Sequence, residues 1–458
     1  MDTNVSNSWE QRDMQAVFHG FTDLGTLNAE GPVILTHGDG IRVFDVHGKS
    51  YIDANSGLWN NVAGFNHQGI IDALCAQARK FPGYHAFFGR VADTTVALSE
   101  KLIELSPFDA GKVYYTNSGS EANDTVVKML WMLHRRNGQP QRRKIITRVN
   151  AYHGVTVATA SMTGKAYNAE FGLPLPGFLH ADCPHYWRFG LEGETELEFS
   201  ARLARNLEEL ILKEGPDTIA GMFAEPVQGA GGVIVPAEGY FEAIRPILRK
   251  YNIPFIADEV ICGFGRTGQM FGSQTFGIRP DILTCAKMLT SGYQPMSAMM
   301  VTPRIFEALV HQSEKLGVFG HGFTYSGHPV PAAVALETLA IYRERDILGH
   351  VRSMTPHLQD GLRALGEHPL VGEARGVGLI GALELVRDKR DRSSFDGKAG
   401  VGAKVVANAQ RRGAIVRSLP GDIIAFSPPL IIQPHEIREL LDAVKGALDD
   451  TWAQTRNL

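Results

Sequence analysis

The sequence predicts an α/β protein of two lobes: a large lobe built on a mainly parallel sheet flanked by helices, and a smaller α+β lobe. Three observations lead to this prediction. The chain has 458 residues, more than one ordinary hydrophobic core accommodates. Short apolar segments alternate with helical segments through the middle of the chain, which is typical of a parallel sheet covered on both faces. The two ends of the chain lack this alternation, and we assign both to the smaller lobe.

The central strands and helices follow from hydrophobic patterns. Short apolar stretches that begin or end in polar residues predict strands at 144–148, 221–225, 254–258 and 281–286. Helical patterns predict helices at 199–213 and 240–250. Functional side chains collect at the carboxyl ends of parallel strands, so Glu225, Asp258 and Lys287 are the first candidates for a site.

The smaller lobe is predicted from both ends of the chain. Residues Thr36 to Asp53 predict a hairpin that turns between Asp45 and Gly48. The last third predicts helices at 352–365 and 434–448 and a strand at 376–384. We therefore expect residues 1–64 and 326–458 to form the small domain and residues 65–325 the large domain.

Composition argues against several function classes. The hydrophobic fraction is 44%, the charged fraction 21% and the net charge -4, which argues against a nucleic-acid partner. We interpret the basic cluster of Arg135, Arg136 and residues 142–144 as a solvated helix end and loop. The four cysteines form no C-x-x-C pair and have no zinc-type spacing, so we expect neither disulfides nor a metal site. We find no signal-peptide pattern and no membrane-spanning apolar run, and therefore expect a cytoplasmic protein with no membrane partner.

Two glycine-rich segments match the G-x-G-x-x-G pattern of dinucleotide sites, at 263–268 and 376–381. Such a site needs the motif between a strand and an apolar helix. The residues after Gly268 are not helical in pattern, and 376–381 continues into an apolar strand. We therefore reject dinucleotide binding.

The strongest signal for chemistry comes from three places taken together. A strand ending near Thr116 leads into a helix predicted at 122–135, where Ser118 with Glu121 fits a capping box. The glycine-serine turn at this helix start offers N–H groups to a phosphate. Asp258 ends a strand, and Lys287 follows an apolar run where burial would depress the pKa of its amine. Each feature alone has an ordinary structural explanation as a cap, a turn or a solvated lysine.

Together these groups are what pyridoxal phosphate requires: N–H groups for a phosphate, a carboxylate for a pyridine nitrogen and an amine for an aldehyde. The sequence resembles the class III (omega) aminotransferases, which are fold type I pyridoxal-phosphate enzymes, from about residue 21 to about residue 448. The motifs that carry the resemblance lie at 55–59, 81–88, 116–124, 152–154, 225–227, 256–268, 286–287 and 321–329.

The resemblance implies cofactor contacts for eight residues: Gly119, Ser120, Tyr152, Glu225, Asp258, Val260, Lys287 and Thr324. Lys287 would form a Schiff base with the cofactor and, once freed, shuttle the proton between substrate and cofactor. Asp258 would keep the pyridine nitrogen protonated. Glu225 would lie near the 3′-oxygen of the cofactor.

The other implied contacts hold the ring and the phosphate. Val260 and Tyr152 would pack on the two faces of the ring, and Gly119 and Ser120 would bind the phosphate. Thr324 would reach the phosphate from a neighbouring subunit, which implies a homodimer with sites at the interface; whether dimers pair into tetramers is left open. Taken alone, Tyr152 could be a core aromatic and Thr324 a turn residue. His153 keeps its ordinary explanation as a histidine satisfied by its neighbours.

The substrate side resembles the amine:pyruvate branch of the family. Ornithine- and GABA-type relatives have a glutamate where this chain has Ala230, and that acid neutralises a substrate-binding arginine. The resemblance implies that Arg417 binds the carboxylate of pyruvate. The implied substrate contacts are Phe21, Leu58, Trp59, Phe87, Phe88, Tyr167, Ala230 and Arg417. We expect a ping-pong transfer from an amine to pyruvate; an aminomutase or a decarboxylase on the same fold remains open.

Overall fold

The computed structural model describes residues 7–456, and its largest sheet has seven strands. Their order is β4-β10-β9-β8-β7-β5-β6, and β10 is the strand that runs antiparallel to its neighbours. The predicted mainly parallel sheet is thereby confirmed. The strands are β4 (Lys112–Thr116), β5 (Lys144–Arg148), β6 (Phe178–Ala181), β7 (Ile219–Ala224), β8 (Phe255–Asp258), β9 (Ile282–Cys285) and β10 (Ser297–Val301).

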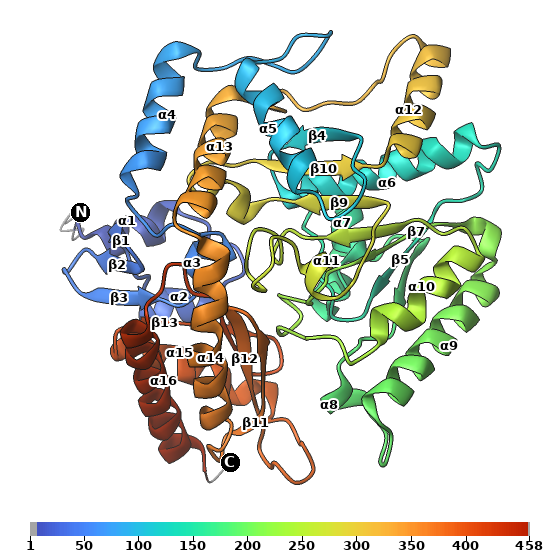
Figure 1. Ribbon diagram of the computed structural model, residues 1–458. Helices are drawn as coiled ribbons and strands as arrows, with labels where there is room; N and C mark the ends of the chain where they lie inside the picture. The colour runs from blue at the N-terminus through green and yellow to red at the C-terminus, as the bar shows by residue number, and fades with distance from the viewer. Residues whose placement is uncertain (1–6, 457–458) are drawn as a thin grey trace, which may run out of the picture.

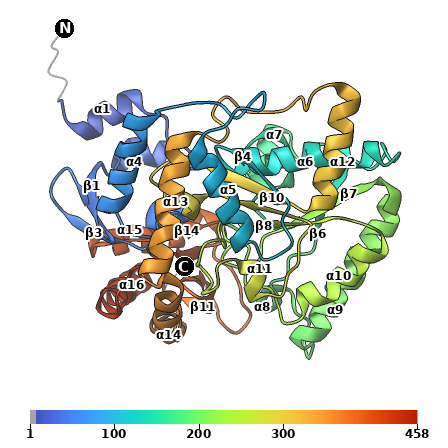
Figure 2. The same ribbon diagram turned by 45° about the horizontal axis from the view of Figure 1, so that its top comes forward.

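Helices cover both faces of this sheet. Successive residues of a strand point to opposite faces, so two neighbouring residues of β5 pack against different helices. Ile146 packs in one buried cluster with α9 (Glu196–Glu214) and α10 (Tyr240–Lys250). Its neighbour Ile145 packs in another with α6 (Gly119–Arg136) and α12 (Pro303–Leu316). Figures 1 and 2 both show these helix pairs on opposite sides of the sheet.

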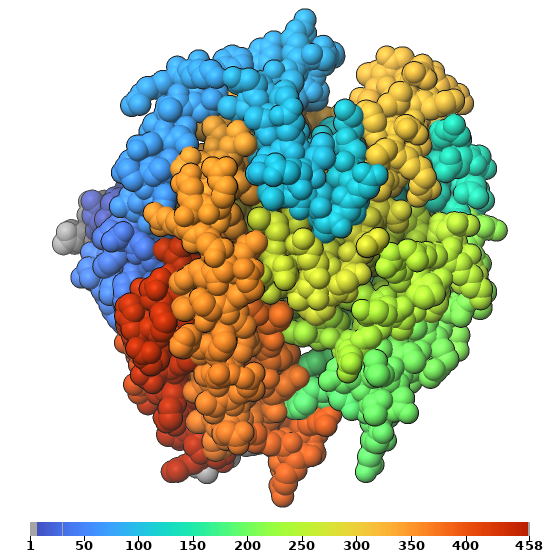
Figure 3. Space-filling view, in the orientation of Figure 1, coloured from blue at the N-terminus to red at the C-terminus, as the bar shows by residue number. Residues whose placement is uncertain are grey.

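The two chain ends meet in one region, as expected. The predicted hairpin is present as β2 (Arg42–Asp45) and β3 (Ser50–Asp53), preceded by β1 (Leu35–Asp39). Strand β13 (Ala414–Ile415) pairs in parallel with β3 and so joins the C-terminal part to the N-terminal one. In the space-filling view the blue and red segments lie against each other beside the orange helices (Figure 3). The exact domain boundaries stay a prediction.

A second four-stranded sheet completes the C-terminal part, with the order β11-β12-β15-β14. Its strands are β11 (Val371–Val377), β12 (Ile380–Leu385), β14 (Arg417–Leu419) and β15 (Ile423–Phe426). The predicted single strand at 376–384 is wrong. Residues 376–377 end β11, Gly378 with φ +59° reverses the chain, and residues 380–384 lie in β12, so the range spans the turn of a hairpin instead of one strand.

The remaining helices connect these sheets or lie on their surfaces. The C-terminal ones are α14 (Ile347–Leu365), α15 (Val401–Arg411) and α16 (Pro434–Thr455), so the helix predicted at 434–448 continues for two further turns. The others are α1 (Trp9–Ala16), α2 (Leu24–Glu30), α3 (Ser56–Trp59), α4 (Gln68–Lys80), α5 (Asp93–Leu105), α7 (Val157–Met162), α8 (Tyr186–Phe189), α11 (Gly272–Thr275) and α13 (Pro329–Glu344). Within residues 7–456, no helix combines the length and apolarity needed to cross a membrane.

The basic cluster after α6 is not fully solvated, contrary to our interpretation. Arg142 is buried, and its guanidinium donates to the carbonyl oxygens of Ile219, Tyr251 and Asn252 and to Asp217. Arg142 therefore joins segments at the amino-terminal ends of neighbouring strands, and its guanidinium stabilises the fold.

A buried ion-pair network links the second sheet to the segment around α8. The Glu384 carboxylate accepts from Arg375 Nη1 at 2.6 Å and from Arg188 Nε at 2.5 Å. Glu373 contacts His185 Nε2 at 2.7 Å and also Arg375. Two arginine side chains thus face two carboxylates, so the charges in this buried network compensate one another.

Candidate active site

A cavity of about 440 Å³ opens at the carboxyl ends of β7, β8 and β9. Residues from distant parts of the chain line it, because the ends of parallel strands meet at one edge of the sheet. Among the predicted residues, the cavity brings together Leu58, Gly119, Ser120, Tyr152, Glu225, Asp258, Val260 and Lys287.

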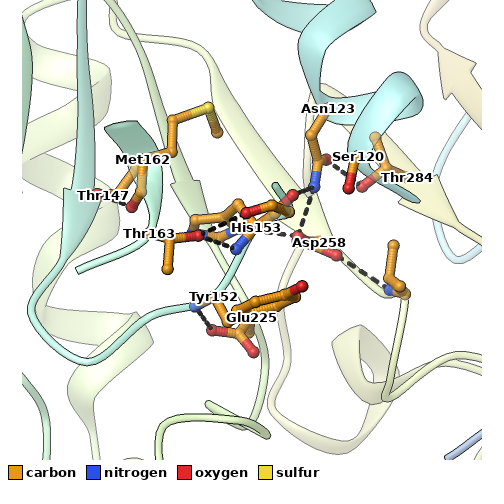
Figure 4. Close-up of polar contacts among 12 residues, drawn as sticks. Ser120, Asn123, Thr147, Tyr152, His153, Met162, Thr163, Glu225, Asp258 and Thr284 are labelled. Carbon is orange, nitrogen blue, oxygen red and sulfur yellow. Dashed lines mark hydrogen bonds and ion pairs between the residues drawn. The ribbon is translucent and has the colours of Figure 1, made fainter. Parts of the chain in front are cut away.

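Asp258, the last residue of β8, is buried and held by three donors (Figure 4). Its Oδ2 accepts from Asn123 Nδ2 at 2.7 Å and lies 2.8 Å from His153 Nδ1. Its Oδ1 accepts from the Val260 N–H at 3.1 Å. A carboxylate with this many donors has a fixed orientation in its buried position.

Asn123 extends this network beyond Asp258. Its Nδ2 also donates to the backbone oxygen of His153 at 2.9 Å, and its Oδ1 accepts from Thr284 Oγ1 at 2.8 Å (Figure 4). We did not predict Asn123. The signal that could have revealed it is a polar residue one turn after Ser120, on the helix face that is otherwise apolar.

Lys287 follows the end of β9 with φ +48°, a conformation that non-glycine residues seldom adopt. Burial lowers the pKa of its amine, the negative charge of Asp258 opposes this shift, and the positive charge of Arg417 adds to it. A lysine with a lowered pKa has a larger neutral, nucleophilic fraction at neutral pH.

The start of α6 forms another wall of the cavity. Ser118 caps the helix by accepting from the Glu121 N–H at 3.2 Å. The reciprocal bond of a capping box is absent, because the Glu121 carboxylate accepts from the Asn117 N–H at 2.7 Å instead of from Ser118. Gly119 lies against Val260: a Cβ at this position would come within 2.8 Å of Val260 Cγ2. The helix N-terminus therefore faces the cavity without a side chain in the way.

Glu225 lies just past β7 and links two segments of the cavity wall. One of its carboxylate oxygens accepts from the N–H of Tyr152 at 3.0 Å (Figure 4). The other accepts from the N–H of Gly229, also at 3.0 Å. Complete burial raises the pKa of Glu225. The Glu225 carboxylate thus fixes the backbone of Tyr152, and Glu225 itself also lines the cavity.

Arg417, the first residue of β14, lies beside an aromatic group at the cavity. Its guanidinium carbon is 5.5 Å from the ring centre of Trp59, and burial lowers its pKa while Tyr152 and Tyr167 oppose that shift. The ring of Phe21 lies 6.0 Å from Tyr167 and 6.4 Å from Tyr152, edge to face. Within residues 7–456, no carboxylate lies within 4.0 Å of Arg417.

Eight predicted residues are not among those that line this cavity: Phe21, Trp59, Phe87, Phe88, Tyr167, Ala230, Thr324 and Arg417. Phe21, Trp59, Tyr167 and Arg417 form the neighbouring group described above. Ala230 is buried in the turn that follows Glu225. Phe87, Phe88 and Thr324 contribute nothing to the lining of the cavity, and Phe88 is 84% exposed. The single chain therefore does not bring these three residues to its own site.

The donor set suits pyridoxal phosphate. The start of α6 offers N–H groups, Asp258 offers a fixed carboxylate, and Lys287 offers an amine with a lowered pKa. The absent side chain at Gly119 leaves the approach to the helix start open.

Comparisons with known proteins agree with this geometry. The family described as aminotransferase class-III matches residues 26–448. A gamma-aminobutyrate transaminase 1 of Oryza sativa subsp. japonica is 49% identical over 429 residues, 93% of this chain and 83% of that protein. One of Solanum lycopersicum is 47% identical over the same shares.

Two solved structures are similar over nearly the whole chain. The PMP-bound aminotransferase of Vibrio fluvialis is 54% identical, with a TM-score of 0.96, and the match covers 98% of this chain and 100% of that one. An omega-aminotransferase of Paracoccus denitrificans is 53% identical with the same TM-score and coverage.

Proposed function

This chain belongs to the class-III aminotransferase family and is a fold type I enzyme that uses pyridoxal 5′-phosphate, and we propose that it moves an amino group from a primary amine or ω-amino acid to pyruvate. One observation carries the choice of acceptor. Arg417 has no carboxylate partner among the described residues, and the loop that could supply one has Ala230. An unpaired, partly buried guanidinium favours binding of a small carboxylate ligand.

The donor side of the proposal rests on the walls of the cavity. Leu58 and Tyr152 line the cavity, and Phe21 lies against the rings of both Tyr152 and Tyr167, the two tyrosines that act on the pKa of Arg417. Such a surface suits the tail of an uncharged or weakly polar amine.

A second candidate concerns the donor itself. Relatives that are 45% to 49% identical carry the name gamma-aminobutyrate transaminase, which favours 4-aminobutyrate as one donor. Its carboxylate would need a cation, and Arg417 could bind it in the first half-reaction as it would bind pyruvate in the second. Ala230 still argues against 2-oxoglutarate as the acceptor, since no acid is available there to neutralise Arg417.

In the proposed mechanism the cofactor, when bound, supplies an aldehyde that accepts the amino group and a ring that withdraws electrons. Asp258, held by Asn123 and His153, keeps a proton on the ring nitrogen. With the cofactor bound, the Nζ of Lys287 would take the proton from the substrate carbon and later give it back. Val260 and Tyr152, which line the cavity, would exclude water from around the bound ring.

The proposal also includes a homodimer with a shared site. Thr324 and Phe88 are exposed in the single chain and are not among the residues that line its own cavity, and Tyr325 is 66% exposed. Exposed aromatic side chains grouped on one face are typical of an interface. We propose that this face meets a second copy and that Thr324 completes the phosphate site of that copy.

A substrate panel tests the function. Purified enzyme is incubated with 4-aminobutyrate, β-alanine, a diamine and 1-phenylethylamine, each with pyruvate or with 2-oxoglutarate, and alanine and glutamate are quantified. We expect alanine from at least one donor and at most a trace of glutamate. Glutamate in excess of alanine would contradict the choice of acceptor. Carbon dioxide release, or an isomer formed without any oxo acid, would favour the decarboxylase or the aminomutase.

A further inference from the structure

His321 anchors the segment between α12 and α13 to helix α6 through both of its ring nitrogens. Nδ1 lies 2.9 Å from Lys128 Nζ, and Nε2 lies 2.9 Å from Thr125 Oγ1. An ammonium group can only donate, so Nδ1 accepts and the ring proton resides on Nε2, which donates to Thr125. Burial, and secondarily the charge of Lys128, lowers the pKa of His321 and keeps the ring neutral.

The ring and backbone of His321 are fixed from other sides as well. Tyr114 of β4 stacks on the ring at 5.8 Å, and its hydroxyl donates to the backbone oxygen of His321 at 3.3 Å. Phe323 and Phe319 meet the ring edge to face at 5.2 and 6.2 Å. The position of His321 is therefore fixed, and it anchors the residues that follow it.

Residues 323–326, which follow His321, form a tight turn at the surface. The Ser326 N–H donates to the Phe323 oxygen at 3.0 Å, and the Phe323 N–H donates to Ser326 Oγ at 3.2 Å. Thr324 lies inside this turn and is exposed. Gly322 lies so close to Phe87 that an added Cβ would overlap its ring, so the turn also packs against the segment before α5. Figures 1 and 2 show the α12–α13 connection and the α4–α5 connection at the same end of the molecule.

We propose that His321 is a positioning residue for the site of a second copy: by holding residues 317–328 on Lys128 and Thr125, it fixes the place from which Thr324 reaches the partner's phosphate site. The inference rests on the dimer of the proposed function. Helix α6 then serves two sites. Its first turn offers Gly119 and Ser120 to its own chain. Thr125 and Lys128, about 7.5 and 12 Å beyond Ser120 along the helix axis, hold the segment that serves the other chain.

The first test measures affinity for pyridoxal phosphate by titrating apoprotein and following its visible absorbance. Lys128→Met removes one donor and leaves the packing of the imidazole in place, and His321→Ala removes the anchor. His311→Ala, at an exposed histidine of α12, is the matched control. We expect about tenfold weaker binding for Lys128→Met, a larger loss for His321→Ala, and no change for the control. Unchanged affinity in both anchor variants would overturn the inference.

Hybrid dimers separate an effect on the partner's site from a general effect on the fold. In a hybrid of a Lys287→Ala chain with a His321→Ala chain, the one competent site receives an intact segment, so it should behave as wild type. In a hybrid of a wild-type chain with a Lys287→Ala/His321→Ala chain, the one competent site receives the altered segment and should show the full loss of affinity and activity. Equal losses in both hybrids, or the reverse pattern, would overturn the inference.

The same hybrids made with Thr324→Ala in place of His321→Ala distinguish a failure of the proposed shared site from a failure of the proposed role of His321. If Thr324→Ala gives no loss across the interface, or if the enzyme is monomeric, the shared site of the proposed function fails. If Thr324→Ala acts across the interface and His321→Ala does not, only the inference about His321 fails.

Discussion

The imidazole of His153 contacts the Asp258 carboxylate inside the protein, with 2.8 Å between Nδ1 and Oδ2. Both side chains are almost completely buried, and Asn123 donates to the same oxygen. The carboxylate is therefore oriented before any ligand binds. Preorganised charge of this kind is what an enzyme needs where charge develops during reaction.

Replacing Asp258 with Asn should leave the fold intact and slow proton removal from the substrate strongly. The reason is that an amide cannot hold a proton on the ring nitrogen. By analogy with other preorganised groups, the loss should be about 3–4 kcal/mol in the activation free energy. Stopped-flow rates of the amine half-reaction measure it, and circular dichroism checks the fold. Near-normal rates would contradict the role of Asp258.

Replacing His153 with Leu should also slow proton removal in the amine half-reaction, but less than replacing Asp258 does. His153 acts through Asp258, and a hydrogen bond to a charged group contributes about 1.5–3 kcal/mol. The Asp258→Asn/His153→Leu double variant should be little slower than Asp258→Asn alone, because the two residues act as a unit. Additive losses in the stopped-flow assay would mean that His153 acts independently.

Replacing Lys287 with Ala should abolish turnover while the cofactor still binds noncovalently at Asp258 and at the start of α6. Lys287 is the lysine that lines the cavity. Alanine formation measures turnover, and equilibrium dialysis measures bound pyridoxal phosphate. More than a trace of transaminase activity would show that another group moves the proton.

The buried amine of Lys287 should also make apoprotein stability depend on pH. Its folded pKa is lowered, so the unfolded chain binds more protons, and stability should rise with pH toward the ordinary lysine value of about 10.4. Lys287→Met removes this penalty. In urea titrations of apoprotein, the variant should be more stable than wild type at neutral pH, and the difference should shrink above about pH 9. A difference independent of pH would contradict the burial of a chargeable amine.

The position of Gly119 should tolerate no side chain. An alanine Cβ would lie 2.8 and 2.9 Å from the two methyl groups of Val260 and would push that side chain toward the ring position. Overpacking of this kind costs about 1–3 kcal/mol, so the affinity for pyridoxal phosphate should fall roughly 5- to 150-fold. Gly397→Ala is the control, because an added Cβ there meets no atom within 4 Å. Equal affinities of the two variants would contradict the close approach.

The site residues that the sequence revealed share one feature: they follow strands. Asp258 and Lys287 were found because β8 and β9 have short, apolar, unambiguous sequences. Asn123 was missed because its partners His153, Asp258 and Thr284 are 30, 135 and 161 residues away, and only the folded sheet brings them together. Local pattern marks Asn123 only as a polar residue on an apolar helix face, and it carries no signal for the partners that lie so far along the chain.

The same limit explains the errors in the fold. The apolar pattern of 376–384 continues through a turn, so it predicted one strand where Gly378 reverses the chain. Arg142 was interpreted as solvated because its acceptors are backbone oxygens 77 to 110 residues away, which no composition reveals. The reach of Thr324 to a second copy, the domain boundaries and the cytoplasmic location stay predictions.

Arg417 provides the most direct test of the proposed transfer from an amine to pyruvate. Wild type and Arg417→Ala are compared in the two half-reactions separately, with 1-phenylethylamine as a donor that lacks a carboxylate and with pyruvate as the acceptor. Losing a charge-assisted bidentate contact costs roughly 2–3 kcal/mol, so kcat/KM for pyruvate should fall about 30- to 150-fold. The same account predicts that kcat/KM for 1-phenylethylamine stays nearly unchanged. Equal losses in both half-reactions would make Arg417 structural, and no loss in either would place the carboxylate site elsewhere.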